Sequence, residues 1–65
     1  MFDNVSYIVR FYVDDVFSDE IYHNTESDAI NHARLFDEFD GYSAIEIVEY
    51  NWSKRCEKQL DVITF

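Results

Sequence analysis

The chain has 65 residues, a formal net charge of −9 and a single cysteine, Cys56. A chain of this length can build one hydrophobic core, so we treat residues 1–65 as a single domain. One cysteine excludes an internal disulfide and a four-cysteine zinc site, and no stretch approaches the roughly 18 consecutive apolar residues of a membrane span.

The N-terminal residues and the lone thiol indicate a cytoplasmic protein. Met1, Phe2, Asp3 and Asn4 provide neither the basic start nor the apolar run of a secretory signal. A single free cysteine fits a reducing compartment. We therefore expect a cytoplasmic location without membrane association.

Charge is unevenly distributed along the chain. Residues 11–53 carry eleven acidic side chains and one basic side chain, Arg34, whereas Lys54, Arg55 and Lys58 lie close together after them. This pattern predicts a long acidic flank and a small basic corner. An acidic flank repels the phosphates of nucleic acids and attracts basic protein surfaces, so direct nucleic-acid binding is not expected.

Alternating apolar residues predict a first strand over residues 5–13. The apolar positions all have odd numbers: Val5, Tyr7, Val9, Phe11 and Val13. Asp14 and Asp15 follow as turn residues, and a second strand is predicted from about Phe17 to His23.

The pairing of these two strands depends on the length of their turn. A three-residue turn pairs apolar with apolar residues and base with acid: Val13 with Phe17, Val9 with Ile21 and Arg10 with Glu20. A two-residue turn would place Val9 opposite Glu20. We favour the three-residue turn, although it lacks the glycine that usually takes its left-handed position.

Residues 26–39 are predicted to form one helix. Thr25 and Asp28 resemble a capping box at its start, and Gly41 supplies the left-handed residue after its end. One face carries an apolar stripe, formed by Ala29, Ile30, Ala33 and Phe36. Leu35 and Phe39 lie to one side of this stripe, so we expect them to be incompletely covered.

Two further strands are predicted over residues 42–50 and 57–65, which gives the element order ββαββ. The fold class is α+β: a four-stranded antiparallel sheet with one helix packed on one face. The face toward the helix is expected to carry Tyr7, Val9, Phe11, Val13, Phe17 and Ile21. One helix leaves the other face uncovered, and that face is expected to present Ile8, Tyr12, Tyr22, Val48 and Tyr50. These five residues are the candidate self-association surface of a homodimer.

Side chains capable of catalysis or metal binding form no recognisable motif. Asp28 and His32 stand four residues apart on the predicted helix, but so short a match favours a surface carboxylate beside an exposed histidine. Cys56 has no neighbouring histidine, which favours a half-buried structural cysteine. Trp52 is either an exposed hot spot or a cover for the sheet edge, and the sequence favours neither. We therefore predict no enzymatic activity, no metal site and no cofactor.

Three segments give the chain a likeness to known proteins: Thr25-Glu26 with Ala29-Ile30 and Ala33, then Gly41-Tyr42, then Ala44-Ile45-Glu46-Ile47-Val48-Glu49. With these segments the chain resembles the small ββαββ proteins encoded by bacteriophages. The resemblance covers most of the chain through size and pattern, and it carries over no site. It implies a setting in which small acidic proteins inhibit host nucleases, restriction systems, CRISPR effectors or DNA-repair glycosylases by occupying surfaces meant for DNA.

The charge pattern and the resemblance both favour a protein-binding module. We expect an inhibitor or DNA mimic that acts on a basic, nucleic-acid-handling protein. Its candidate partner contacts are the acids on predicted turns, edges and helix ends: Asp14, Asp15, Asp19, Glu20, Glu26, Asp37, Glu38 and Asp40. The alternative is a structural or assembly protein that homo-oligomerises through its open aromatic sheet face, with its acidity serving solubility.

Overall fold

The computed structural model describes residues 4–65. In chain order its elements are β1 Val5–Val13, β2 Val16–His23, α1 Glu26–Ala33, the 3-10 turn η1 Glu38–Asp40, β3 Ala44–Asn51 and β4 Cys56–Thr64. Met1, Phe2 and Asp3, on which the expectation of a cytoplasmic protein partly rests, lie outside the described residues.

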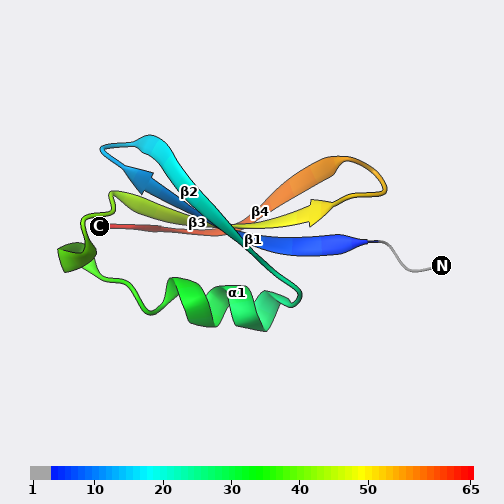
Figure 1. Ribbon diagram of the computed structural model, residues 1–65, viewed down its shortest axis with the longest axis horizontal. Coiled ribbons are helices and arrows are strands. Elements are labelled where there is room, and N and C mark those ends of the chain that lie inside the picture. The colour runs from blue at the N-terminus through cyan, green and yellow to red at the C-terminus, as the bar shows by residue number, and fades with distance from the viewer. Residues whose placement is uncertain (1–3) are drawn as a thin grey trace.

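The four strands form one antiparallel sheet in the order β2-β1-β3-β4, and α1 lies along one face of it (Figure 1). The predicted ββαββ order and α+β fold are thus confirmed. The sheet face away from α1 is called the open face below. Within residues 4–65, no helix is long and apolar enough to cross a lipid bilayer.

The hydrophobic core lies between α1 and the two central strands, β1 and β3. Its buried members are Val9, Phe11, Ile45 and Ile47 from the sheet and Ala29 and Ala33 from the helix. Because alanine has a single side-chain carbon, these two positions let the helix lie close to the sheet. Phe36 follows the helix in sequence and packs edge-on against Phe11, with ring centroids 5.1 Å apart.

The helix begins as predicted but ends earlier. Thr25 caps its start, because the Thr25 hydroxyl accepts the backbone N–H of Asp28 at 3.1 Å. The prediction of a helix to about residue 39 was wrong, since α1 ends at Ala33.

The early end has a local cause in Asp37, which caps the separate turn η1. Its carboxylate accepts the N–H of Phe39 at 2.8 Å, and its own N–H donates to the Asp40 carboxylate at 2.7 Å. An aspartate that bonds to nearby backbone groups competes with continuation of a helix. Gly41 takes the predicted left-handed conformation, with φ of 88°, but it ends η1 rather than α1.

The turn between β1 and β2 has two residues, so the predicted three-residue turn was wrong. Asp14 and Asp15 have φ values of 52° and 64°, and Val13 pairs directly with Val16. Positive φ at both central residues is the signature of a type I′ turn, whose twist matches that of the flanking strands. Aspartate tolerates this conformation better than most residues, which is why the turn forms without glycine.

A β-bulge at Ser18 reconciles this short turn with the rest of the hairpin. The register skips Ser18, because Tyr12 pairs with Phe17 and Phe11 pairs with Asp19. Farther from the turn the predicted pairs are confirmed: Val9 with Ile21 and Arg10 with Glu20. The bulge also corrects one face assignment, since Phe17 lies beside Tyr12 on the open face and not toward the helix, with ring centroids 6.2 Å apart.

A second bulge lies in β4 at Leu60, the residue skipped between the partners of Ile47 and Val48. It brings Leu60 and Ile63, three residues apart, against the core on the helix side of the sheet. Val62 consequently lies on the open face.

Candidate functional site

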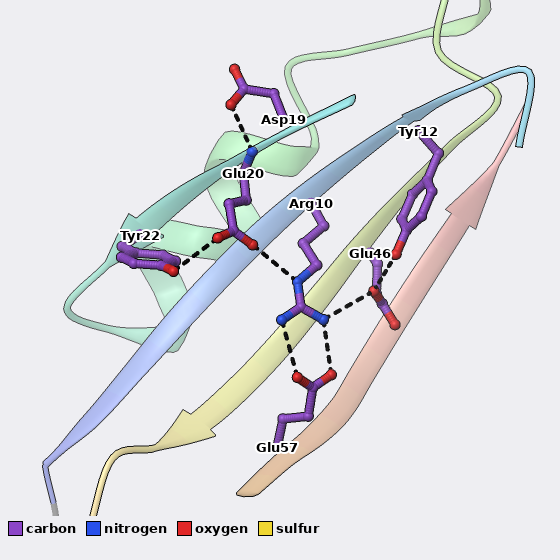
Figure 2. A network of polar contacts seen from close by, with 7 residues as sticks. All are labelled: Arg10, Tyr12, Asp19, Glu20, Tyr22, Glu46 and Glu57. Carbon is purple, nitrogen blue, oxygen red and sulfur yellow. Dashed lines mark hydrogen bonds and ion pairs between the residues drawn. The ribbon is translucent and has the colours of Figure 1, made fainter. Parts of the chain in front are cut away.

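A network of charged side chains lies at the centre of the open face, around Arg10 of β1 (Figure 2). The guanidinium donates two hydrogen bonds to Glu57 of β4, at 2.8 and 3.0 Å, and one to Glu20 of β2, at 3.2 Å. A third carboxylate, Glu46 of β3, approaches it to 3.7 Å. One arginine therefore links all four strands, and these four residues are called the Arg10 network.

The contact between Arg10 and Glu57 shifts the pKa of both residues in the directions expected for paired charges. The hydrogen bonds that Arg10 donates to Glu57 are the main reason that the pKa of Arg10 is raised above its ordinary value, and Glu20 adds to the effect. The hydrogen bond from Arg10 in turn lowers the pKa of Glu57. Three carboxylates surround one guanidinium, so the network carries two excess negative charges at neutral pH.

Two tyrosines extend the network along the open face. Tyr12 donates its hydroxyl to Glu46 at 2.9 Å, and Tyr22 donates its hydroxyl to Glu20 at 2.8 Å. Burial, followed by the hydrogen bond to Glu46, raises the pKa of Tyr12. The hydrogen bond to Glu20 is the main cause of the raised pKa of Tyr22. Both phenols thus stay protonated and act as hydrogen-bond donors.

Of the alternatives that the sequence left open for Trp52, the structure shows that the side chain folds back onto the sheet, although it stays 42% exposed. Its indole nitrogen donates to the hydroxyl of Ser6 at 2.9 Å, and its ring packs at 75° to Tyr22 and at 64° to Tyr50. The three rings are called the aromatic cluster. It forms one end of the open face, beside the Arg10 network.

The open face therefore differs from the exposed aromatic patch that the sequence predicted. Ile8 and Val48 are only 2% and 0% exposed, because they lie in the middle of the sheet between the aromatic cluster and the Arg10 network. Tyr12 is half-buried, as is Tyr50, whereas Tyr22 is 51% exposed. Of the five candidate self-association residues, Ile8 and Val48 are already buried within the chain itself.

Five of the eight candidate partner-binding acids lie at one end of the molecule, and we call them the acidic end: Asp14, Asp15, Asp37, Glu38 and Asp40. Asp14 and Asp15 come from the β1–β2 turn, and the other three lie on or beside η1 (Figure 1). Ser43 joins the two segments, since its hydroxyl accepts the N–H of Asp15 at 2.9 Å and its N–H donates to the carbonyl of Tyr12 at 2.8 Å.

The three remaining candidate acids lie elsewhere. Glu20 is engaged by Arg10 and Tyr22, and the carboxylate of Asp19 accepts the N–H of Glu20 at 2.8 Å. Glu26 lies on the first turn of α1, away from the acidic end (Figure 1). The acidic end therefore contains five of the eight predicted contacts. Their grouping could not be predicted from the sequence, because they come from two segments that are far apart along the chain.

Two large apolar side chains in the segment that follows α1 are highly exposed. Phe39 of η1 is 88% exposed and Leu35 is 77% exposed, so their predicted incomplete cover is confirmed, although neither residue lies in α1. The basic residues Lys54 and Arg55 lie in the β3–β4 loop at the opposite end of a body 43 Å long (Figure 1). The molecule is therefore electrically polarised along its long axis.

On the helix side, His23 and His32 form a pair that the sequence did not predict. His23 Nε2 and His32 Nδ1 are 2.9 Å apart, which joins the end of β2 to α1. His32 also packs against the rings of Phe11 and Phe36, so the expectation of an exposed histidine beside Asp28 was wrong. Burial is the main cause of the lowered pKa of His32, and the nearby His23 adds to it.

Cys56 is exposed, so the prediction of a half-buried structural cysteine was wrong. It is the first residue of β4 and directly follows Arg55, whose φ of 52° closes the loop. Within residues 4–65, no three side chains of the His, Cys, Asp or Glu type cluster closely enough to hold a metal ion.

Comparisons with protein-family models, with curated protein sequences and with solved structures found no match to this chain.

Proposed function

We propose that this chain is an acidic protein-binding module whose acidic end docks on a basic, nucleic-acid-handling protein and competes there with DNA. The observation that carries the proposal is the gathering of five carboxylates from two separate segments at one end of an elongated body. Carboxylates on a compact body can occupy a groove that otherwise binds phosphates. The proposed partners are nucleases, restriction or CRISPR enzymes and DNA-repair enzymes of a host cell.

The charge polarity gives the proposed complex an orientation. A basic partner attracts the acidic end and repels the loop that carries Lys54 and Arg55 at the other end. The exposed ring of Phe39 lies within the acidic end, held on a turn that Asp37 caps from both directions. An exposed aromatic side chain can bury a large apolar area against a partner, so we assign Phe39 the central contact.

We expect this chain neither to bind DNA directly nor to act as an enzyme. A net charge of −9 opposes direct binding to DNA, and we propose neither catalysis nor a cofactor. The exposed thiol of Cys56 fits a reducing environment, so we place the protein in the cytoplasm of the host cell.

The proposal is tested by capture of partners from a bacterial lysate, identified by mass spectrometry. The test variant combines Asp14→Asn, Asp15→Asn and Glu38→Gln, and we expect it to fold because asparagine suits a type I′ turn. The matched control removes the same charge elsewhere, through Glu26→Gln, Asp28→Asn and Asp61→Asn.

We expect the wild-type protein and the control to capture a basic nucleic-acid-binding protein, and the test variant to lose it. Added duplex DNA or raised salt should release the captured protein, because charged surfaces drive the complex. Equal capture by the test variant and the control contradicts the proposal. A gel shift of duplex DNA by the protein alone contradicts it as well.

Self-association through the open face is the second candidate function, and it has its own supporting observation. Four large apolar side chains on that face are 42–51% exposed: Phe17, Tyr22, Trp52 and Val62. Apolar patches of this kind often mark interfaces. Such a dimer would persist at high salt, in contrast to a charge-driven complex.

A further inference from the structure

A hollow of about 210 Å³ lies on the open face, next to the acidic end. Its walls are Tyr12, Asp15, Ala44, Glu46 and Val62. Drug-sized ligands usually occupy cavities of about 300–1,000 Å³, so this hollow suits one side chain better than a whole small molecule. Asp15 belongs both to the hollow and to the acidic end, so one partner can contact the two together.

The chemistry of the walls favours a cation with an apolar stem. Ala44 and Val62 are apolar, and Tyr12 adds an aromatic side chain to the walls. An aromatic ring attracts a cation over its face. The Tyr12 hydroxyl and Arg10 approach the same oxygen of Glu46, Oε1, at 2.9 and 3.7 Å. The hydrogen bonds described for residues 4–65 leave the second oxygen, Oε2, available to accept from a ligand.

The charge around the hollow points in the same direction. The Arg10 network carries three carboxylates against one guanidinium, and Asp15 adds a further negative charge beside it. The side chain of Glu46 is only 16% exposed, so water screens its charge incompletely. A second cation at this position would offset the excess charge.

We propose that this hollow receives an arginine side chain of the basic partner. The inference rests on the proposed function and names the feature of the partner that the open face recognises. The guanidinium stacks on the ring of Tyr12, its N–H groups donate to Glu46 and Asp15, and its stem lies against Val62. Arginine fits better than lysine, because its planar head can stack on a ring and donate to two carboxylates together.

The test uses three short peptides, acetyl-Gly-Xaa-Gly-amide, with arginine, lysine or citrulline at the central position. Citrulline has nearly the shape of arginine without its charge. Each peptide is titrated into the intact protein labelled with ¹⁵N, and backbone amide shifts are followed by NMR. We expect the arginine peptide to shift the amides of Asp15, Ala44 and Val62 saturably with a millimolar Kd, the lysine peptide to bind more weakly and the citrulline peptide to cause no saturable shift.

Two variants localise the binding. Glu46→Gln keeps the shape of the side chain and removes its charge, and we expect it to weaken the arginine peptide by about tenfold, as expected for loss of a charge-assisted hydrogen bond. Glu26→Gln removes the same charge on α1 and should leave the Kd unchanged. The melting temperature of each variant, followed by circular dichroism, verifies that it folds.

A linear, non-saturating response, equal binding of the citrulline peptide or equal Kd values for Glu46→Gln and Glu26→Gln would overturn the proposal. These outcomes differ from failure of the proposed function, which is read from lysate capture. If Glu46→Gln captures the same partner as the wild type while Asp14→Asn with Glu38→Gln, which leaves Asp15 of the hollow unchanged, does not, the acidic end binds the partner and the hollow does not.

Discussion

Replacement of Arg10 by Met should destabilise the protein at neutral pH by removing the guanidinium that links the four strands. Methionine retains an unbranched apolar stem, so the change isolates the charged head group. Without it, Glu20, Glu46 and Glu57 remain close together on the open face with no compensating charge. Both the lost hydrogen bonds and the new repulsion act against folding.

The magnitude follows from the exposure of the side chains. Arg10 is 19% exposed, Glu20 33% and Glu57 46%, so water partly screens both hydrogen-bonded pairs. Exposed pairs contribute about 0.2–1 kcal/mol, and shielded hydrogen bonds to charged groups contribute about 1.5–3 kcal/mol. Two half-shielded pairs and the carboxylate repulsion together give about 2 kcal/mol. For a domain of this size, that corresponds to a fall in melting temperature of roughly 8–16 °C.

The loss should depend on pH, since it comes from ionised carboxylates. The pKa of Glu57 is lowered from 4.5 in the folded protein, so its pairing stabilises the fold above that pH. This contribution disappears as the pH falls through the lower, folded-state pKa. The variant and the wild type should therefore converge in strongly acidic solution, where the carboxylates are protonated.

Thermal unfolding followed by circular dichroism measures the effect, with Arg34→Met as the matched control. Arg34 is exposed, and the ion pairs described within residues 4–65 do not include it. The control should melt near the wild-type temperature. Equal melting temperatures for the two variants at neutral pH, or an Arg10→Met deficit that persists in strong acid, would refute the role assigned to the Arg10 network.

Four further predictions address other parts of the molecule. The pKa of His32 is lowered in the fold, so the unfolded chain binds more protons than the folded protein below about pH 6.5. The urea concentration at the unfolding midpoint should therefore fall as the pH is lowered from about 7 to about 5.5 in the wild type. It should change less in a variant in which His23 and His32 are both Gln. A Cβ at Gly41 would meet no atom within 4 Å, so Gly41→Ala should lower the free energy of unfolding only by the left-handed backbone strain, about 1–2 kcal/mol. Gly41→Asn should lower it less, and urea unfolding measures both values. Chelators should leave the melting temperature unchanged, and a drop of several degrees would indicate a metal site. Light scattering should detect a dimer at high micromolar protein, and Tyr22→Lys should shift it toward monomer; a wild-type monomer under these conditions rules out the self-associating role.

The strands of this fold could be predicted because each depends on local periodicity. Val5 to Val13 alternate over nine residues, and no proline interrupts any strand. The end of the helix could not be predicted in the same way. The apolar stripe continues through Phe36, but the side chain of Asp37 forms its own capped turn, and sequence periodicity contains no signal for that competition.

In the candidate site, the sequence predicted only the contact between two strands that follow each other along the chain. Arg10 and Glu20 belong to one hairpin, so their pairing followed from matching base with acid. The contact between Arg10 and Glu57 spans 47 residues and requires the registers of two strand pairs, β1 with β3 and β3 with β4, the second of which contains the Leu60 bulge. A lone basic residue within an otherwise uncharged strand was the available signal that carboxylates would gather around it.

The two bulges also determine how copies of this molecule can meet. Ser18 and Leu60 lie on β2 and β4, the two outer strands of the sheet, whose remaining backbone N–H and C=O groups face outward. A regular outer strand is a template on which another chain can add a strand, and repeated addition yields fibrils. Each bulge interrupts that template and increases its local twist. Strand addition at either edge, and with it indefinite growth of the sheet, is thereby disfavoured.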